Sequence, residues 1–81
     1  MYCTYIIQSE STKRYYIGST ANIEDRLKRH NLNYSLSTKF RGPWKLEFKK
    51  PFPTRSEAII LEFQIKKRGA KRFLEDLNKS G

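Results

Sequence analysis

A phenol, a guanidinium and an imidazole follow one another closely in the segment from Tyr15 to His30. Tyr16 stands two residues before Gly18, and Arg26 and His30 are four residues apart. A phenol can donate or accept a proton, a guanidinium can hold phosphate oxygens through two parallel hydrogen bonds, and an imidazole can transfer a proton near neutral pH. These residue types together point to proton transfer beside a bound anion.

The surrounding residues predict the elements that must position these groups. A β-strand is expected to end at Gly18, and a helix is expected to begin after Asn22, a favoured N-cap residue. Along that helix Ile23 and Leu27 form an apolar stripe, and the arginine and the histidine share an adjacent face. The strand thus delivers the Tyr16 phenol beside both basic groups.

A second tyrosine is expected on a neighbouring strand. Residues 2–8 and 14–18 are rich in aromatic and β-branched side chains, and the short polar segment between them predicts an antiparallel hairpin. Because side chains alternate along a strand, the hairpin register decides whether Tyr5 and Tyr16 share a face. The sequence leaves that register open.

The next segments predict a loop and a third strand. Residues 31–42 carry Asn and Ser every few positions, which is typical of a loop, and their Lys39 and Arg41 are either solvated charges or contacts to phosphates. After Pro43, residues 44–50 alternate apolar and charged side chains, as in a strand with one buried face. The side chains expected to face the core are Trp44, Leu46 and Phe48.

Two helices are predicted to close the chain. Residues 54–57 match a capping box, so one helix should begin near Arg55 and end at Gly69, and residues 70–78 predict a last short helix. Glu62 lies in the mostly apolar part of the first of these helices, where a Glu is seldom buried without a partner. It is either an ordinary solvated carboxylate or an oxygen ligand for Mg²⁺.

Composition narrows the class of protein. The length of 81 residues predicts one domain, residues 1–81, with one modest core, and the net charge of +9 favours a polyanionic partner such as nucleic acid. Cys3 is the single cysteine and is expected to be a packed apolar residue; with one His, it cannot complete a tetrahedral zinc site. No secretory signal or transmembrane run appears, so we expect a cytoplasmic protein with no membrane partner.

The two strands of the predicted hairpin carry the triplets Thr4-Tyr5-Ile6 and Tyr16-Ile17-Gly18, and polar residues follow on the later helices. In this order and spacing the chain resembles the GIY-YIG nuclease superfamily. The polar positions that carry the resemblance are Tyr5, Tyr16, Arg26, His30 and Glu62. The pairs Thr38-Lys39 and Pro43-Trp44 and the run 55–58 further resemble its small stand-alone bacterial branch, the UPF0213-like proteins, which consist of this domain alone. The pattern departs from the family at Cys3 and Thr4, where Gly and Ile are usual.

The resemblance implies an α+β fold, with a three-stranded antiparallel sheet flanked by helices in the order β-β-α-β-α-α. It also implies an endonuclease that hydrolyses DNA phosphodiester bonds with one divalent ion, Mg²⁺ or Mn²⁺. One of the two phenols, Tyr5 or Tyr16, would deprotonate the attacking water. Arg26 would steady the charge on the phosphate, His30 would assist proton transfer, and Glu62 would bind the metal ion.

An alternative interpretation is a non-catalytic nucleic-acid-binding module of the same fold. The basic side chains that would hold the backbone are Lys28, Arg29, Lys39, Arg41, Lys66 and Lys67. The sequence leaves the substrate open between branched, damaged or simple DNA, and RNA. We expect a monomer that binds weakly and with low specificity, because one small domain offers few phosphate contacts.

Overall fold

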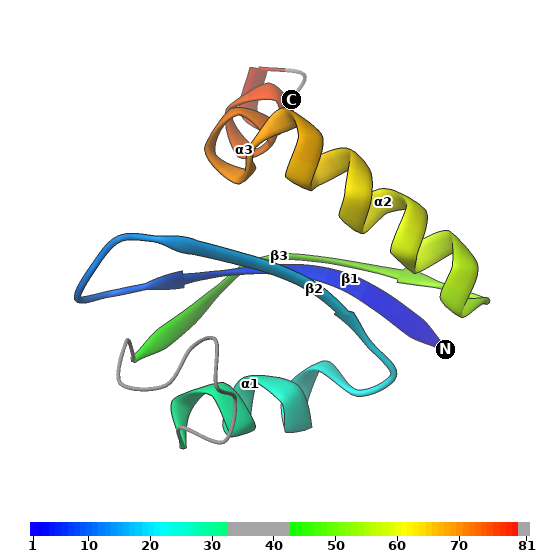
Figure 1. Ribbon diagram of the computed structural model, residues 1–81, viewed down its shortest axis with the longest axis horizontal. Coiled ribbons are helices and arrows are strands. Elements are labelled where there is room, and N and C mark those ends of the chain that lie inside the picture. The colour runs from blue at the N-terminus through cyan, green and yellow to red at the C-terminus, as the bar shows by residue number, and fades with distance from the viewer. Residues whose placement is uncertain (33–42, 80–81) are drawn as a thin grey trace.

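The computed structural model describes residues 1–32 and 43–79 (Figure 1). Strands and helices follow the predicted order β-β-α-β-α-α. Their bounds are β1 Tyr2–Ser9, β2 Tyr15–Thr20, α1 Ile23–Asn31, β3 Trp44–Phe52, α2 Arg55–Arg68 and α3 Ala70–Lys79. The sheet lies between two helical layers, with α1 on one face and α2 and α3 on the other (Figure 1).

The sheet is antiparallel, with strand order β2-β1-β3. The predicted α+β class, its antiparallel sheet and its flanking helices are therefore confirmed. β1 lies in the centre and is buried along most of its length, whereas β2 and β3 are the two edges. All three strands extend one or two residues beyond the predicted ends.

The register of the hairpin settles how the two tyrosines lie. Tyr5 pairs with Gly18, and Ile7 pairs with Tyr16. Residues that lie directly opposite each other share a face, so both tyrosines point to the same side of the sheet. That side is covered by α1, the helix that carries the arginine and the histidine.

One prediction about β3 is wrong in part. Trp44 and Leu46 pack on the α1 side, as a common face requires, but Phe48 packs on the other side, against Phe73 of α3. The pairing slips here: Ile7 faces Leu46, whereas Ile6 faces Phe48. The extra residue, Glu47, forms a β-bulge, and a one-residue slip moves every later side chain to the opposite face.

The bulge divides the apolar side chains into two layers where the sequence predicted a single core. On the α1 side the buried residues are Tyr5, Ile7 and Trp44. On the α2 side they are Ile6, Ile65 and Ala70. A sheet covered on both faces holds its central strand rigid, which suits a strand that carries a site residue.

Capping and a side-chain clamp set the ends of the helices. The Asn22 side chain accepts from the backbone N–H of Asp25 at 3.0 Å, and Thr54 caps α2 by accepting from the N–H of Glu57 at 3.3 Å. At the other end of α1, the Asn31 side chain accepts from the backbone N–H of Trp44 at 2.6 Å and donates to its carbonyl at 3.3 Å. α1 is thereby attached to β3.

Among the described helices, none combines the length and apolar character that crossing a membrane requires.

Candidate active site

The Tyr5 hydroxyl and the His30 ring form the centre of the site. The hydroxyl oxygen lies 3.1 Å from Nε2 of His30, within hydrogen-bond distance. Both side chains are buried, with exposed fractions of 1% for Tyr5 and 0% for His30. β1 positions the tyrosine and the last turn of α1 positions the histidine, so residues far apart in the sequence form one buried polar pair.

Tyr16 completes an aromatic cluster with this pair. Its ring centroid lies 5.0 Å from that of His30 and 6.4 Å from that of Tyr5. Trp44, which the sequence assigned only to the core, closes the cluster at 6.3 Å from the His30 ring. Tyr16 is only partly buried, unlike Tyr5, so its phenol is the more accessible to a ligand from solvent.

Burial keeps the central pair uncharged. It raises the pKa of the Tyr5 phenol above its ordinary value, Tyr16 and Glu62 add to the rise, and the Arg26 guanidinium opposes it. Burial also lowers the pKa of His30, and the positive charge of Arg26 lowers it further. Tyr5 is therefore a neutral phenol and His30 a neutral imidazole at neutral pH.

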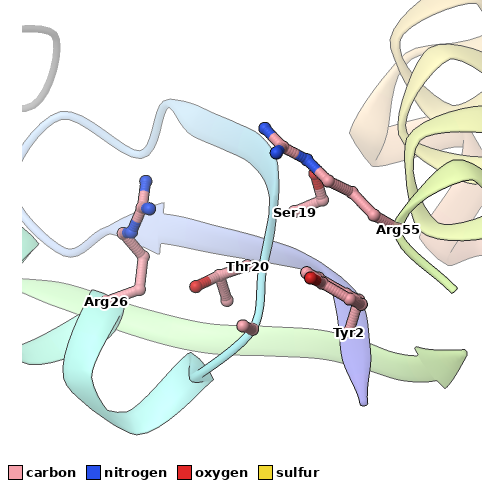
Figure 2. A pocket seen from close by; sticks show the side chains of 6 residues that line it. Tyr2, Ser19, Thr20, Arg26 and Arg55 are labelled. Carbon is pink, nitrogen blue, oxygen red and sulfur yellow. The ribbon is translucent and has the colours of Figure 1, made fainter. Parts of the chain in front are cut away.

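Arg26 lines a hollow of about 240 Å³ at the end of β2 (Figure 2). A second guanidinium, that of Arg55, reaches the same hollow from the start of α2, so the two arginines flank the end of β2 from opposite helical layers. The remaining lining residues are Tyr2, Ser19, Thr20 and Ala21. Of all these residues, only Arg26 was predicted to belong to the site.

A weak sequence signal for this hollow did exist. Ser19 and Thr20 follow directly after the Tyr-Ile-Gly triplet, where a strand end presents hydroxyls at a sheet edge. The contribution of Arg55 depends on where α2 begins relative to that edge, and no local pattern encodes this.

Glu62 lies in the opposite helical layer from Arg26 and His30. It lies on α2, with 16% of its side chain exposed, and its carboxylate accepts a 2.7 Å ion-paired hydrogen bond from Lys66. Its negative charge still acts on Tyr5, since it contributes to the raised pKa of that phenol. In the described part of the chain, no group of three or more His, Cys, Asp or Glu side chains gathers as a ready-made metal site.

The described basic side chains that are expected to bind nucleic acid form two separate pairs, one on α1 and one on α2. Lys28 and Arg29 are exposed on α1, and Arg29 pairs with Asp25 at 3.0 Å. Lys66 and Lys67 are exposed near the end of α2. The two remaining positions, Lys39 and Arg41, lie outside the described residues.

The two departures from the family pattern take structural roles. Cys3 is a buried free thiol whose pKa is raised by burial, which disfavours the reactive thiolate. The Thr4 hydroxyl donates a buried 2.6 Å hydrogen bond to the carbonyl of Ala58. Thr4 thus fastens α2, the helix that carries Glu62 and Arg55, to the central strand.

Comparison with known proteins gives a family match along nearly the whole chain. A family model described as the GIY-YIG catalytic domain matches residues 1–76. A UPF0213 protein of Bacillus licheniformis is 39% identical over 70 residues, which cover 82% of this chain and 72% of that protein. A UPF0213 protein from Bacillus halodurans, solved by solution NMR, is 25% identical and matches with a TM-score of 0.58, covering 100% of this chain and 87% of that one.

Larger proteins also contain a similar region. The structure-specific endonuclease subunit Slx1 of the fungus Pyrenophora tritici-repentis is 32% identical over 80 residues, which cover 91% of this chain. The Slx1 subunit of Phaeosphaeria nodorum is 31% identical over the same length. The chain spans only 22% of the length of either Slx1 protein.

Proposed function

Because the chain belongs to the GIY-YIG family of catalytic domains, we propose that it is an endonuclease that hydrolyses DNA phosphodiester bonds with one divalent metal ion. Residues 1–81 would act as a single domain. The Slx1 relatives are named as subunits of a structure-specific endonuclease, and the proposal assigns the same kind of activity to this chain. Branched or flapped DNA is therefore the first substrate to test.

The arrangement of Tyr5, Tyr16 and His30 is the observation that carries the proposal. A buried hydrogen bond links Tyr5 to His30, and the partly exposed Tyr16 packs beside them with its ring tilted, with Arg26 near by. A buried polar pair that served stability alone would not need a second, accessible phenol and a guanidinium at its edge. A phenol that accepts a proton and a guanidinium fit phosphodiester hydrolysis, because water must lose a proton while negative charge grows on the phosphate.

Accessibility assigns the two phenols different roles. Tyr16 takes the proton of the attacking water while it releases its own phenolic proton, since it is the phenol that solvent can reach. Arg26 binds the non-bridging oxygens of the scissile phosphate and stabilises the charge that develops there. Tyr5, held neutral by burial, takes up the proton that Tyr16 releases and donates its own to Nε2 of the neutral His30 imidazole.

The candidate site offers a divalent cation only some of the ligands that it needs. Mg²⁺ commonly uses one or two protein carboxylates and completes its shell with water and substrate phosphate. Glu62 supplies one such carboxylate, and Lys66 would have to leave it before a cation is held there. When bound, the cation would supply Lewis-acid stabilisation of the phosphate.

The ion pair of Glu62 with Lys66 also supports the second candidate, a binding module without catalysis. A carboxylate that is already paired is a poorer metal ligand, whereas the net charge of +9 suffices for a backbone-binding protein. Such a module would bind DNA or RNA with a steep salt dependence and would not cut either.

A cleavage assay separates the two candidates. Labelled linear, flapped and branched DNAs and a matched RNA would be incubated with the full chain, with Mg²⁺, Mn²⁺ or a chelator. Tyr16→Phe and Arg26→Ala are expected to abolish metal-dependent cutting, whereas Arg72→Ala, which removes an exposed arginine on α3, should leave it unchanged. Salt-sensitive binding without cutting by the wild type would favour the binding module.

A further inference from the structure

The hollow between Arg26 and Arg55 is polar, positively charged and open to solvent at an unpaired sheet edge. β2 is an edge strand: β1 pairs with Ser19 and Thr20 on one side, and in the described sheet no strand pairs with them on the other. The volume of about 240 Å³ is roughly an order of magnitude above what one water molecule requires. The hollow therefore has room for a solvated anionic group.

No acidic side chain in the described ranges, 1–32 and 43–79, forms an ion pair with either arginine of this hollow. The Thr20 hydroxyl is used in the turn, where it contacts the backbone N–H and carbonyl of Asn22. The Ser19 hydroxyl has no such partner in the described part of the chain, which leaves it available to a ligand.

Arg55 stands at a position where a cation does not help the fold. It is the first residue of α2, directly after the Thr54 cap. The N-terminal end of a helix carries partial positive charge and favours acidic side chains. An exposed arginine placed against this dipole contributes nothing to helix stability, and Figure 2 shows it extending towards Ser19 over the hollow.

We propose that this hollow binds a second DNA phosphate, next to the scissile one, and that Arg55 is its main ligand. The position of this phosphate next to a scissile one rests on the proposed nuclease function, but the phosphate site itself is independent of cutting. Arg26 lines both places: its charge acts on Tyr5 and His30, and its side chain also borders the hollow. The two arginines would then hold consecutive stretches of one backbone, Arg26 at the reacting phosphate and Arg55 beyond it.

This arrangement assigns Arg55 to binding and not to the chemical step. Arg55 comes from the α2 layer, whereas Tyr16 and His30 lie on the α1 side of the sheet. Removing its guanidinium should weaken DNA binding and raise KM, with kcat unchanged, because ground state and transition state lose the same contact. Removing Arg26 should instead lower kcat.

The test begins with binding in a chelator, where no cutting occurs. Affinity for a fluorescent flapped duplex would be measured between 50 and 200 mM salt for wild type, Arg55→Ala, Arg55→Lys and Arg72→Ala. One lost phosphate contact lowers the slope of log K against log salt by about 0.9. We expect that loss for Arg55→Ala alone, a slope near wild type for Arg55→Lys, and no change for Arg72→Ala. Thermal melting should show that Arg55→Ala folds as well as wild type.

Cleavage kinetics provide a second test of the phosphate site. If the wild type cuts, Arg55→Ala should raise KM several-fold at constant kcat. If the wild type does not cut, the nuclease proposal fails but the slope measurement still decides the phosphate site. The proposal is overturned if Arg55→Ala and Arg72→Ala show the same slope, or if Arg55→Ala lowers kcat at unchanged KM.

Discussion

Gly18 lies directly opposite Tyr5 in the β1–β2 ladder, beneath the phenol ring of that tyrosine. A Cβ atom at position 18 would stand 2.7 Å from the Tyr5 hydroxyl oxygen and 2.9 Å from Cζ. Real Cβ atoms do not approach other atoms so closely. The glycine of the Tyr-Ile-Gly triplet is therefore needed for the space that it leaves, and that space places the Tyr5 hydroxyl within reach of His30.

Gly18→Ala should displace the Tyr5 ring and break its contact with His30. Overpacking of this kind costs about 1–3 kcal/mol, and we expect a loss of that size in the free energy of unfolding together with a strong loss of cleavage. Denaturant unfolding and single-turnover cleavage measure the two effects.

Gly69, the residue that ends α2, offers a matched control. Gly69 has a φ of +96°, but apart from its own chain neighbours no described residue places an atom within 4 Å of its would-be Cβ. Gly69→Ala should therefore destabilise the fold through backbone strain, by about 1 kcal/mol, and leave cleavage by the folded protein unchanged. Equal loss of cleavage in both variants would show that stability alone, and not the Tyr5 position, explains the Gly18 result.

Tyr16→Phe and Tyr5→Phe should separate catalysis from stability. Loss of the Tyr16 hydroxyl removes the proposed general base, and we expect a fall in kcat of about 10²–10⁴ with little change in melting temperature. Loss of the Tyr5 hydroxyl removes a buried hydrogen bond from His30, which costs about 1–3 kcal/mol of stability, with a smaller fall in kcat. A larger fall in kcat for Tyr5→Phe would reassign the base to Tyr5.

Local sequence patterns were sufficient to predict the strands and helices but not the register in which the strands pair. The aromatic and β-branched runs, the Asn22 cap and the Thr54 cap are local features, and each predicted its strand or helix within two residues. The pairing of Tyr5 with Gly18 depends on how two strands align, and the Glu47 bulge depends on how β3 meets β1. Neither is encoded within a single segment, which is why the face of Phe48 was predicted wrongly.

The same limit applies to the site. Tyr16 could be predicted as a neighbour of Arg26 and His30 because a strand and its following helix are contiguous in the chain, whereas the face of Tyr5 depended on the hairpin register. Arg55 could not be predicted as part of this group, because its place beside Ser19 follows from the packing of α2 across the sheet. Its role therefore emerges only from tertiary structure.

The stability of the protein should fall in mild acid because of His30. The folded protein lowers the pKa of this imidazole through burial and the charge of Arg26, whereas the unfolded chain retains the ordinary value of about 6.5. Above that pH both states are neutral and the group contributes nothing. As the pH falls below it, the unfolded state binds the proton first, so stability declines by up to about 1.4 kcal/mol per pH unit until the folded pKa is reached.

This decline can be assigned to one residue, because His30 is the only histidine in the chain. Melting temperature measured between pH 7.5 and 5.5 should drop for the wild type and stay flat for His30→Gln, whatever the absolute stability of that variant. Parallel pH profiles for the two proteins would show that other groups cause the decline.

Glu62→Gln should abolish metal-dependent cleavage while DNA binding in a chelator persists. The amide removes the anionic oxygen that a hard cation requires, and it also releases Lys66 from its 2.7 Å ion pair, so affinity for DNA should stay equal or rise slightly. Glu75→Gln removes the same charge from an exposed position on α3 and should leave both cleavage and its metal dependence unchanged. Titration of Mg²⁺ and Mn²⁺ against cleavage rate for the three proteins tests this. Wild-type metal dependence in Glu62→Gln would exclude Glu62 as the ligand and move the metal site elsewhere in the chain.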